Sequence, residues 1–147
     1  MQPGIKNDLV HLLIMLQSIE KVNLFSEKFN SASDFYQYND QIAFDACLLM
    51  LTNIGERSSR LSEEATEKYS EIPWKKIKQV RNRIAHDYTG VDFEIAFSII
   101  NNDLPPLKTT IIKIIRDELS NGIFSSEEFE LAKKSEYYRH IKFAEIA

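Results

Sequence analysis

The chain has 147 residues, which is enough for one domain around a single hydrophobic core and short for two. Hydrophobic residues make up 44% and charged residues 27%, a globular composition that excludes an intrinsically disordered chain. The net charge of −4 argues against a general nucleic-acid binder. The single cysteine, Cys47, excludes an internal disulfide and falls in an apolar segment, so we expect it to be a small core residue.

The first predicted element is a helix over about 5–29, because apolar residues recur there at three- and four-residue steps. Its most apolar run, Val10–Leu16, is too short to span a bilayer and lacks a small-residue cleavage site. We therefore expect no membrane segment and a cytoplasmic protein. After a polar break at 30–33, a second long helix is predicted to begin near Asp34 or Phe35 and to continue through Ile54.

The middle of the chain is predicted to hold a polar connection over 62–70, with room for a short helix, and then a third helix from Trp74 to about Ala85. Pro73 has no backbone donor, so it suits the position before the first turn of that helix. The pair Thr89–Gly90 ends the third helix, and Asp92 is expected to cap a fourth that begins near Phe93.

The last third predicts a break at 101–106 and then a fifth helix that stops at Asn121–Gly122. Ser125 with Glu128 forms a capping box for a terminal helix over about 126–144. No segment alternates polar and apolar residues over a length typical of strands. The sequence therefore predicts an all-α helical bundle with an additional C-terminal helix.

One basic spot stands out in this acidic chain. Residues 71–90 hold five Lys or Arg against two Asp or Glu, a net +3, which leaves −7 for the rest. Within this window Arg81 falls in the apolar arc of its helix, where a permanent charge is costly unless it is paired or opens onto a cleft. Two interpretations follow: Arg81 binds an anion, or it is a buried structural residue paired, for instance, with Glu56.

His86 follows Arg81 by five residues, which places the two about 140° apart on a continuous helix. They can converge if the helix unwinds after Ala85, or if two copies of the chain form one site. His11 and His140 have no companions at metal-ligand spacing, and neither a glycine-rich phosphate loop nor a nucleophile triad is present. We therefore expect no metal and no cofactor.

The segment 72–88 contains an Ile-Pro-Trp lead-in followed by R-x4-H-x-Y, formed by Arg81, His86 and Tyr88. Ile54-Gly55-Glu56 and Leu61-Ser62 precede it, and Val91-Asp92 and Asp103-Leu104-Pro105 follow it. In this order the motifs resemble those of the HepT-type toxins, a branch of the HEPN superfamily usually encoded beside a minimal nucleotidyltransferase (MNT) antitoxin. The resemblance covers about residues 5–117.

The resemblance implies a HEPN-type bundle over residues 1–119 that pairs into a homodimer, with the R-x4-H motifs lining a shared cleft. It also implies the toxin of a type II-like toxin–antitoxin system, a metal-independent endoribonuclease that cleaves RNA. By position, Arg81 and His86 are the catalytic pair and Asn82 assists them. Tyr88 matches the tyrosine on which a cognate MNT nucleotidyltransferase attaches adenylate (AMPylation), which silences the toxin. Lys78 and Arg83 are expected to contact RNA phosphates.

The expected chemistry suits these side chains, because an imidazole can act as acid or base near neutrality and a guanidinium matches phosphate oxygens. One motif offers one histidine, whereas two subunits offer an acid and a base together. The chain departs from the family pattern at Arg57, which adds charge beside Glu56, and in a C-terminal extension over 120–147. That extension is expected to form a helix that packs on the bundle or dimer. Alternatively, its basic residues assist RNA or partner contact: Lys133, Lys134, Arg139, His140 and Lys142.

Two other hypotheses stay open at this point. In the first, the chain is a non-catalytic HEPN module that binds nucleotide or a nucleotidyltransferase partner, with Arg81 and the basic spot holding phosphate. In the second, Arg81 and His86 are dimer-interface residues without a ligand.

Overall fold

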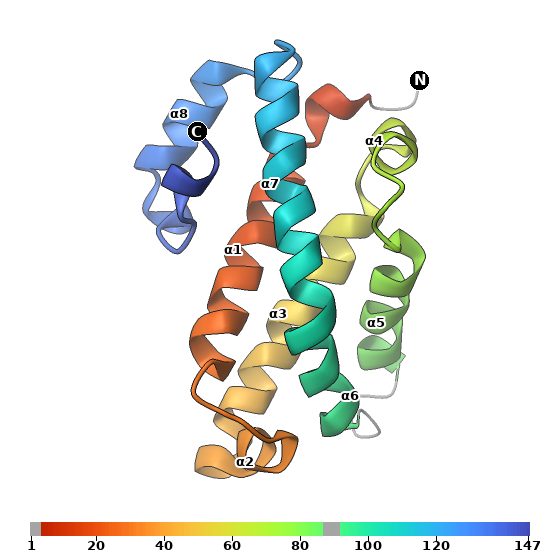
Figure 1. Ribbon diagram of the computed structural model, residues 1–147, viewed down its shortest axis with the longest axis vertical. Helices are drawn as coiled ribbons and strands as arrows, with labels where there is room; N and C mark the ends of the chain where they lie inside the picture. Colours follow the sequence, from red (N-terminus) through yellow and green to blue (C-terminus); the bar gives the residue numbers. More distant parts are fainter. Residues whose placement is uncertain (1–3, 87–91) are drawn as a thin grey trace.

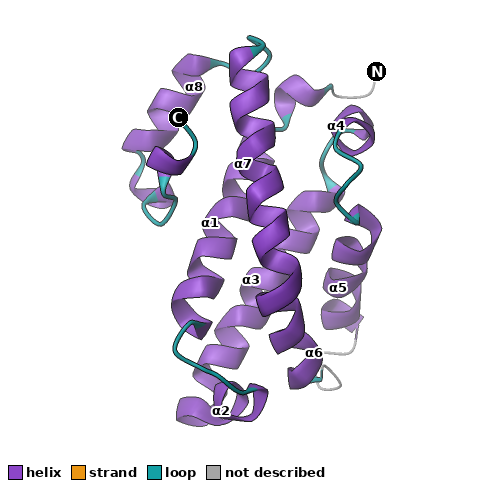
Figure 2. Cartoon of the chain, viewed as in Figure 1, coloured by secondary structure: helices purple, strands orange, loops and turns teal. Residues whose placement is uncertain are grey.

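A computed structural model of the chain describes residues 4–86 and 92–147, apart from the side chains of Arg83, Ala85 and His86. Every regular element in these ranges is helical, as predicted (Figure 2). Helices α1 (Leu9–Ser26), α3 (Ile42–Ser59) and α7 (Leu104–Ser120) form the centre of the bundle. Helix α5 (Trp74–His86) packs on α3, on the side away from α1 (Figure 1). The predicted all-α bundle is confirmed.

The hydrophobic core lies between α1, α3 and α7. Fully buried side chains from all three helices fill it, among them Leu12, Leu16, Ile19, Leu48, Ile54, Ile111, Ile114 and Ile115. Cys47 is also buried there, as predicted. By length and composition, helix α1 is long and apolar enough to cross a membrane. The length of the apolar run Val10–Leu16 therefore understates the length of the apolar helix. However, 61% of this helix is buried inside the bundle, as expected for a core helix.

The second predicted helix is in fact two helices, so that prediction was wrong. Helix α2 (Ala32–Gln37) ends before a turn in which Asn39, Asp40 and Gln41 all adopt left-handed backbone conformations, and α3 begins at Ile42. Asn and Asp tolerate this region better than other residues. Apolar spacing cannot detect such a reversal, because it continues on both sides of the turn. The reversal seats Phe35, which is fully buried, against the ring of Phe44.

The start of α5 is fixed by the segment before it. The predicted short helix is present as α4 (Glu63–Lys68), and the Ser62 hydroxyl at its N-terminus accepts a hydrogen bond from Ala65 N–H. Trp74, the first residue of α5, donates its indole N–H to the carbonyl of Tyr69 at 3.0 Å. Pro73 directly precedes the helix, as predicted, where no backbone donor is needed.

The fourth helix, α6 (Phe93–Ser98), begins where predicted, and Asp92 caps it by accepting from Glu94 N–H at 2.7 Å. The predicted break at 101–106 was wrong. The chain instead continues through a π-helical turn, Ile99–Asp103, directly into α7. Two prolines, Pro105 and Pro106, occupy the first turn of α7, where a missing N–H costs nothing. Helix α7 stops before Gly122, which adopts a positive φ, as the sequence predicts.

The C-terminal helix is shorter than predicted. Helix α8 (Ser126–Lys134) begins with the expected Ser125 cap but ends at Lys134, because Ser135 turns extended and accepts from Tyr137 N–H. Short 3₁₀ turns then return the chain against α1 and α7 (Figure 1). Arg116 of α7 holds this end by donating to the carbonyls of Ile146 and Glu145 at 2.9 and 2.7 Å.

Candidate functional site

The candidate site lies where α5 makes its closest approach to α3. Gly55 of α3 faces the side chain of Arg81, and a Cβ added at Gly55 would overlap Cβ of Arg81 and lie 3.2 Å from the carbonyl of Ile77. Only a glycine permits this approach. The Arg81 side chain therefore starts directly against α3 and extends across its surface.

Arg81 is held by an ion pair with Glu56, the residue that follows Gly55. Its Nε lies 3.1 Å from Oε2 of Glu56, although it is not directed there in hydrogen-bond geometry. The other carboxylate oxygen of Glu56 lies 3.1 Å from Nη2 of Arg60. The interpretation of Arg81 as a buried structural residue predicted its pairing with Glu56, and that ion pair is present. However, the Arg81 side chain is 37% exposed rather than buried. The guanidinium is therefore braced and still accessible from solvent.

Two more of the predicted site residues accompany Arg81 on the same side of α5. Asn82 is exposed, and its Oδ1 accepts a hydrogen bond from Nη1 of Arg81 at 2.9 Å. Lys78 is half-buried one turn earlier, and it has no ion pair within residues 4–86 and 92–147. Successive helix residues are about 100° apart, so Lys78, Arg81 and Asn82 share one arc. The structure brings these three predicted residues together.

The other predicted residues fall outside what the structure describes. Helix α5 stays helical through His86, so it does not unwind after Ala85, which was one of the two ways for His86 to meet Arg81. The side chains of Arg83 and His86, and the whole of Tyr88, lie outside the described residues. The roles of Arg83, His86 and Tyr88 therefore stay predictions.

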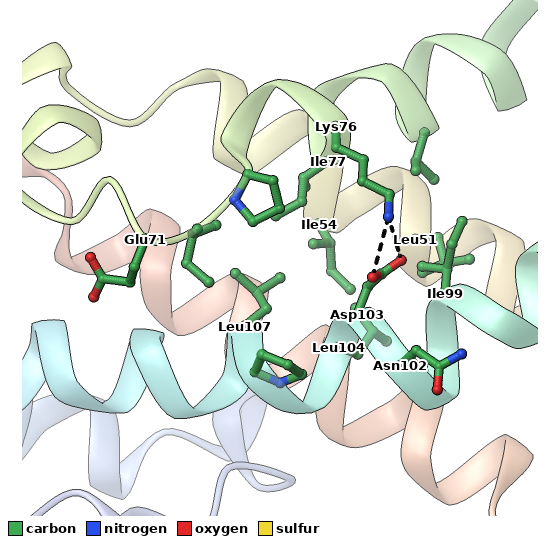
Figure 3. A pocket seen from close by; sticks show the side chains of 14 residues that line it. Leu51, Ile54, Glu71, Lys76, Ile77, Ile99, Asn102, Asp103, Leu104 and Leu107 are labelled. Carbon is green, nitrogen blue, oxygen red and sulfur yellow. Dashed lines mark hydrogen bonds and ion pairs between the residues drawn. The ribbon is translucent and has the colours of Figure 1, made fainter.

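A groove of about 480 Å³ lies on the opposite side of α5, between that helix and α6. It adjoins a smaller apolar cavity of about 140 Å³, and Lys76 and Asp103 line both spaces. These two side chains form an ion pair at 3.3 Å (Figure 3). Arg81 lines neither space. Neither space therefore forms part of the candidate site around Arg81.

The chemistry available at this surface comes from cations and one carboxylate. Among the described residues, no three His, Cys, Asp or Glu side chains are grouped as metal ligands would be. Burial raises the pKa of the Cys47 thiol to about 12, which removes it as a nucleophile near neutrality. The arrangement of Glu56, Arg60 and Arg81 is suited to binding an anion such as phosphate.

Two features of this surface were missed in the sequence. Arg60 follows Glu56 by four residues, a spacing at which a helix places an ion pair, so that contact was detectable. The guanidinium of Arg57 lies 3.3 Å from Nδ1 of His11 in α1. No local pattern indicates that contact, because it exists only through the packing of α1 on α3.

Comparison with known proteins identifies the class. The model of a family described as "HepT-like: Ribonuclease HepT-like" matches residues 15–114, more than half of the chain. The chain belongs to this HepT-like ribonuclease family. The family resemblance inferred from R-x4-H-x-Y and its flanking motifs is thereby confirmed.

Several curated proteins are similar to this chain. A Methanocaldococcus jannaschii protein named "Gamma-glutamylcyclotransferase and putative RNase" is 32% identical over 108 residues, which cover 74% of this chain and 47% of that protein. A "Putative RNase" of Caldanaerobacter subterraneus subsp. tengcongensis is 33% identical, covering 60% of this chain and 77% of its own. A "Probable ribonuclease HepT" of Thermococcus cleftensis is 30% identical, covering 47% and 63%.

The chain thus spans about half the length of the M. jannaschii relative and larger shares of the other two. No solved structure matches the chain.

Proposed function

We propose that the chain is a metal-independent endoribonuclease that acts as the toxin of a toxin–antitoxin system in the cytoplasm. The observation that carries this proposal is the braced, solvent-accessible Arg81, which lies beside Asn82 in the R-x4-H segment of a HepT-like ribonuclease. Membership of that family supports RNA as the substrate. An arginine that only stabilised the core would be buried with its partner, whereas Arg81 and Glu56 are both about one-third exposed.

In the proposed reaction, His86 removes the proton of a ribose 2′-hydroxyl as general base. The 2′-oxygen attacks the adjacent phosphorus, the P–O5′ bond breaks, and a proton from a second imidazole neutralises the leaving 5′-oxygen. The products are a 2′,3′-cyclic phosphate and a 5′-hydroxyl end. The Arg81 guanidinium stabilises the negative charge that develops on the phosphorane oxygens, and Asn82 fixes its orientation.

This reaction needs an acid and a base at once, so we propose that two subunits supply them. Along α3, the solvent-facing stripe that contains Glu56 also carries Ile42 and Leu49, which are 56% and 59% exposed. Exposed apolar side chains arranged in a row are typical of a subunit interface. Pairing of two copies along the Ile42–Leu49 part of this stripe would leave the surface around Glu56 open and bring both Arg81 side chains to one cleft.

We further propose that an MNT nucleotidyltransferase antitoxin silences the toxin by AMPylation of Tyr88. Tyr88 belongs to the same R-x4-H-x-Y motif as Arg81, and an adenylate on it would add a negatively charged phosphate of the kind that an arginine binds. Mass spectrometry of the chain after co-expression with such an enzyme is expected to show added mass in multiples of one adenylate on Tyr88. An unmodified Tyr88 contradicts this silencing step without affecting the nuclease proposal.

The nuclease proposal is tested by incubating the purified chain with single-stranded RNA in the presence of EDTA. We expect cleavage with cyclic phosphate ends and no loss of rate on chelation. The non-catalytic alternative, a module that binds nucleotide or a nucleotidyltransferase, predicts binding without cleavage and no growth arrest when the chain is expressed alone. Intact RNA, or cleavage that EDTA abolishes, contradicts the proposal.

A further inference from the structure

A second cationic position lies on α3, next to the candidate site but on its other flank. Arg57 follows Glu56 in the sequence and is turned about 100° around the helix, toward α1. The carboxylate of Glu56 is already shared by Arg60 and Arg81. Within the described residues no carboxylate pairs with Arg57, and its polar contact is with His11. The guanidinium therefore keeps an uncompensated positive charge.

The contact with His11 is itself informative. A guanidinium only donates, so Nδ1 of His11 accepts from Nη1 of Arg57 at 3.3 Å and the opposite ring nitrogen carries the proton. Burial lowers the pKa of His11, and the charges of Arg57 and Arg60 lower it further, while Asp8 opposes them. The Asp8 carboxylate is already engaged by the backbone N–H and hydroxyl of Ser62, the latter at 2.6 Å. The pair thus presents donors and a positive charge.

The C-terminal extension lies against α1, the helix that carries His11. Burial raises the pKa of Tyr138 and Tyr137 raises it further, whereas the positive charge of Arg57 lowers it. The same segment is tied to α1 through Gln17, whose Oε1 accepts from the backbone N–H of His140 at 3.1 Å. Tyr137, Tyr138 and His140 lie beyond the part of the chain that the family model matches, residues 15–114.

We propose that Arg57 and His11 form a second phosphate-binding subsite, which holds a phosphodiester of the RNA substrate away from the bond that is cleaved. The inference rests on the proposed nuclease function. The subsite lies on the α1 flank of α3 and Arg81 on the α5 flank, so about one helix diameter, roughly 10 Å, separates them. An RNA strand that crosses α3 at the level of residues 56–60, beyond the exposed Ile42 and Leu49 of the proposed subunit interface, would contact both, with Arg60 between them.

The test measures the binding of a fluorescent eight-nucleotide single-stranded RNA to chains that carry His86→Ala, so that the RNA stays intact. Arg57→Gln removes one positive charge from the subsite. Lys113→Gln is the matched control, because Lys113 lies on α7, is 60% exposed, and its loss changes the net charge equally. Arg57→Lys keeps the charge and serves as the charge-preserving variant.

We expect Arg57→Gln to weaken binding about tenfold at low salt and to reduce the slope of log affinity against log salt by about 0.7, the loss of one phosphate contact to a single strand. Lys113→Gln and Arg57→Lys should keep the slope of the parent. Circular dichroism checks that both variants are folded. If Arg57→Gln then binds RNA as tightly as Lys113→Gln does, the proposed subsite is contradicted, while the nuclease proposal is unaffected. A parent chain that binds no RNA contradicts both.

Discussion

Gly55 of α3 and Arg81 of α5 are packed so closely that a methyl group at position 55 would overlap the Cβ of Arg81. The residue after this glycine, Glu56, is the one that pairs with the Arg81 guanidinium. The glycine sets how near the two helices come, and the carboxylate sets where the arginine points. The geometry of the candidate site therefore depends on two neighbouring residues of α3 as much as on α5.

We expect Gly55→Ala to destabilise the fold by about 1–3 kcal/mol, because the overlap involves Cβ and backbone atoms that cannot move without shifting α5. Helix propensity alone predicts the opposite sign, a gain of about 1 kcal/mol for alanine over glycine. Urea denaturation measures the difference. Ala46→Gly, at a half-buried position of the same helix, is the control and should lose about the propensity amount. A stabilised Gly55→Ala protein would show that the helices can separate freely.

Replacing Glu56 by glutamine is expected to affect RNA binding and cleavage in opposite directions. Loss of the carboxylate removes the negative charge between Arg60 and Arg81, so RNA should bind several-fold more tightly at low salt. Arg81 also loses the ion pair that positions its guanidinium, so the cleavage rate at saturating RNA should fall about tenfold to a hundredfold. Separate measurements of Kd and single-turnover rate distinguish the two effects. If the rate at saturation is unchanged, Glu56 does not position Arg81.

Much of the fold was predictable because its determinants are local. Asp92 and Ser125 were predicted as N-caps from residue type and position, and both make the cap hydrogen bond. The two errors in the middle of the chain arise where the backbone departs from ordinary helix. The left-handed turn at 39–41 divides one apolar pattern into two helices. The π-helical turn at Ile99–Asp103 joins two segments between which a break was predicted.

The candidate site was predictable only in part, for a related reason. Arg81 with Glu56 was foreseen because a charge in an apolar arc needs a partner. The contact of Arg57 with His11 depends on how α1 packs against α3, and nothing in either helix's own sequence specifies it. The C-terminal helix was predicted ten residues too long, since Ser135 ends it with a local hydrogen bond to Tyr137 N–H that competes with helix.

Glu118 of α7 is expected to make stability depend on pH. Burial alone would raise its pKa, but hydrogen bonds from Lys68, Tyr69 and Asn121 outweigh that effect and hold the pKa below its ordinary 4.5. The stabilisation is therefore complete above about pH 4.5 and is lost as the pH falls through the lower, folded value.

Glu118→Gln should cost about 1–3 kcal/mol at pH 7, because a fully buried group loses charge-assisted hydrogen bonds. The difference from the parent chain should narrow below pH 4. Urea denaturation at pH 7 and pH 3.5 provides both values, with the exposed Glu130→Gln as the control. An equal cost at both pH values would mean that the ionised carboxylate is not what stabilises the fold.

A site shared between two subunits makes a distinct prediction for mixed variants. His86→Ala alone should be nearly inactive. A mixed dimer of one parent subunit and one His86→Ala subunit keeps a single imidazole, so it lacks either the acid or the base and should cleave about as slowly as the variant alone. The mixture is prepared by refolding both chains together and assayed against single-stranded RNA. A mixed dimer, present by native mass spectrometry, that cleaves at about half the parent rate would place the acid and the base of one reaction on the same subunit.

The central claim is that His86 transfers protons during metal-free RNA cleavage at a phosphate held by Arg81. The direct measurement is the single-turnover cleavage rate of single-stranded RNA in EDTA, for the parent chain and for His86→Ala at equal stability. We expect the variant to be slower by about 10²–10⁴-fold. Cleavage by purified His86→Ala at the parent rate would contradict this assignment.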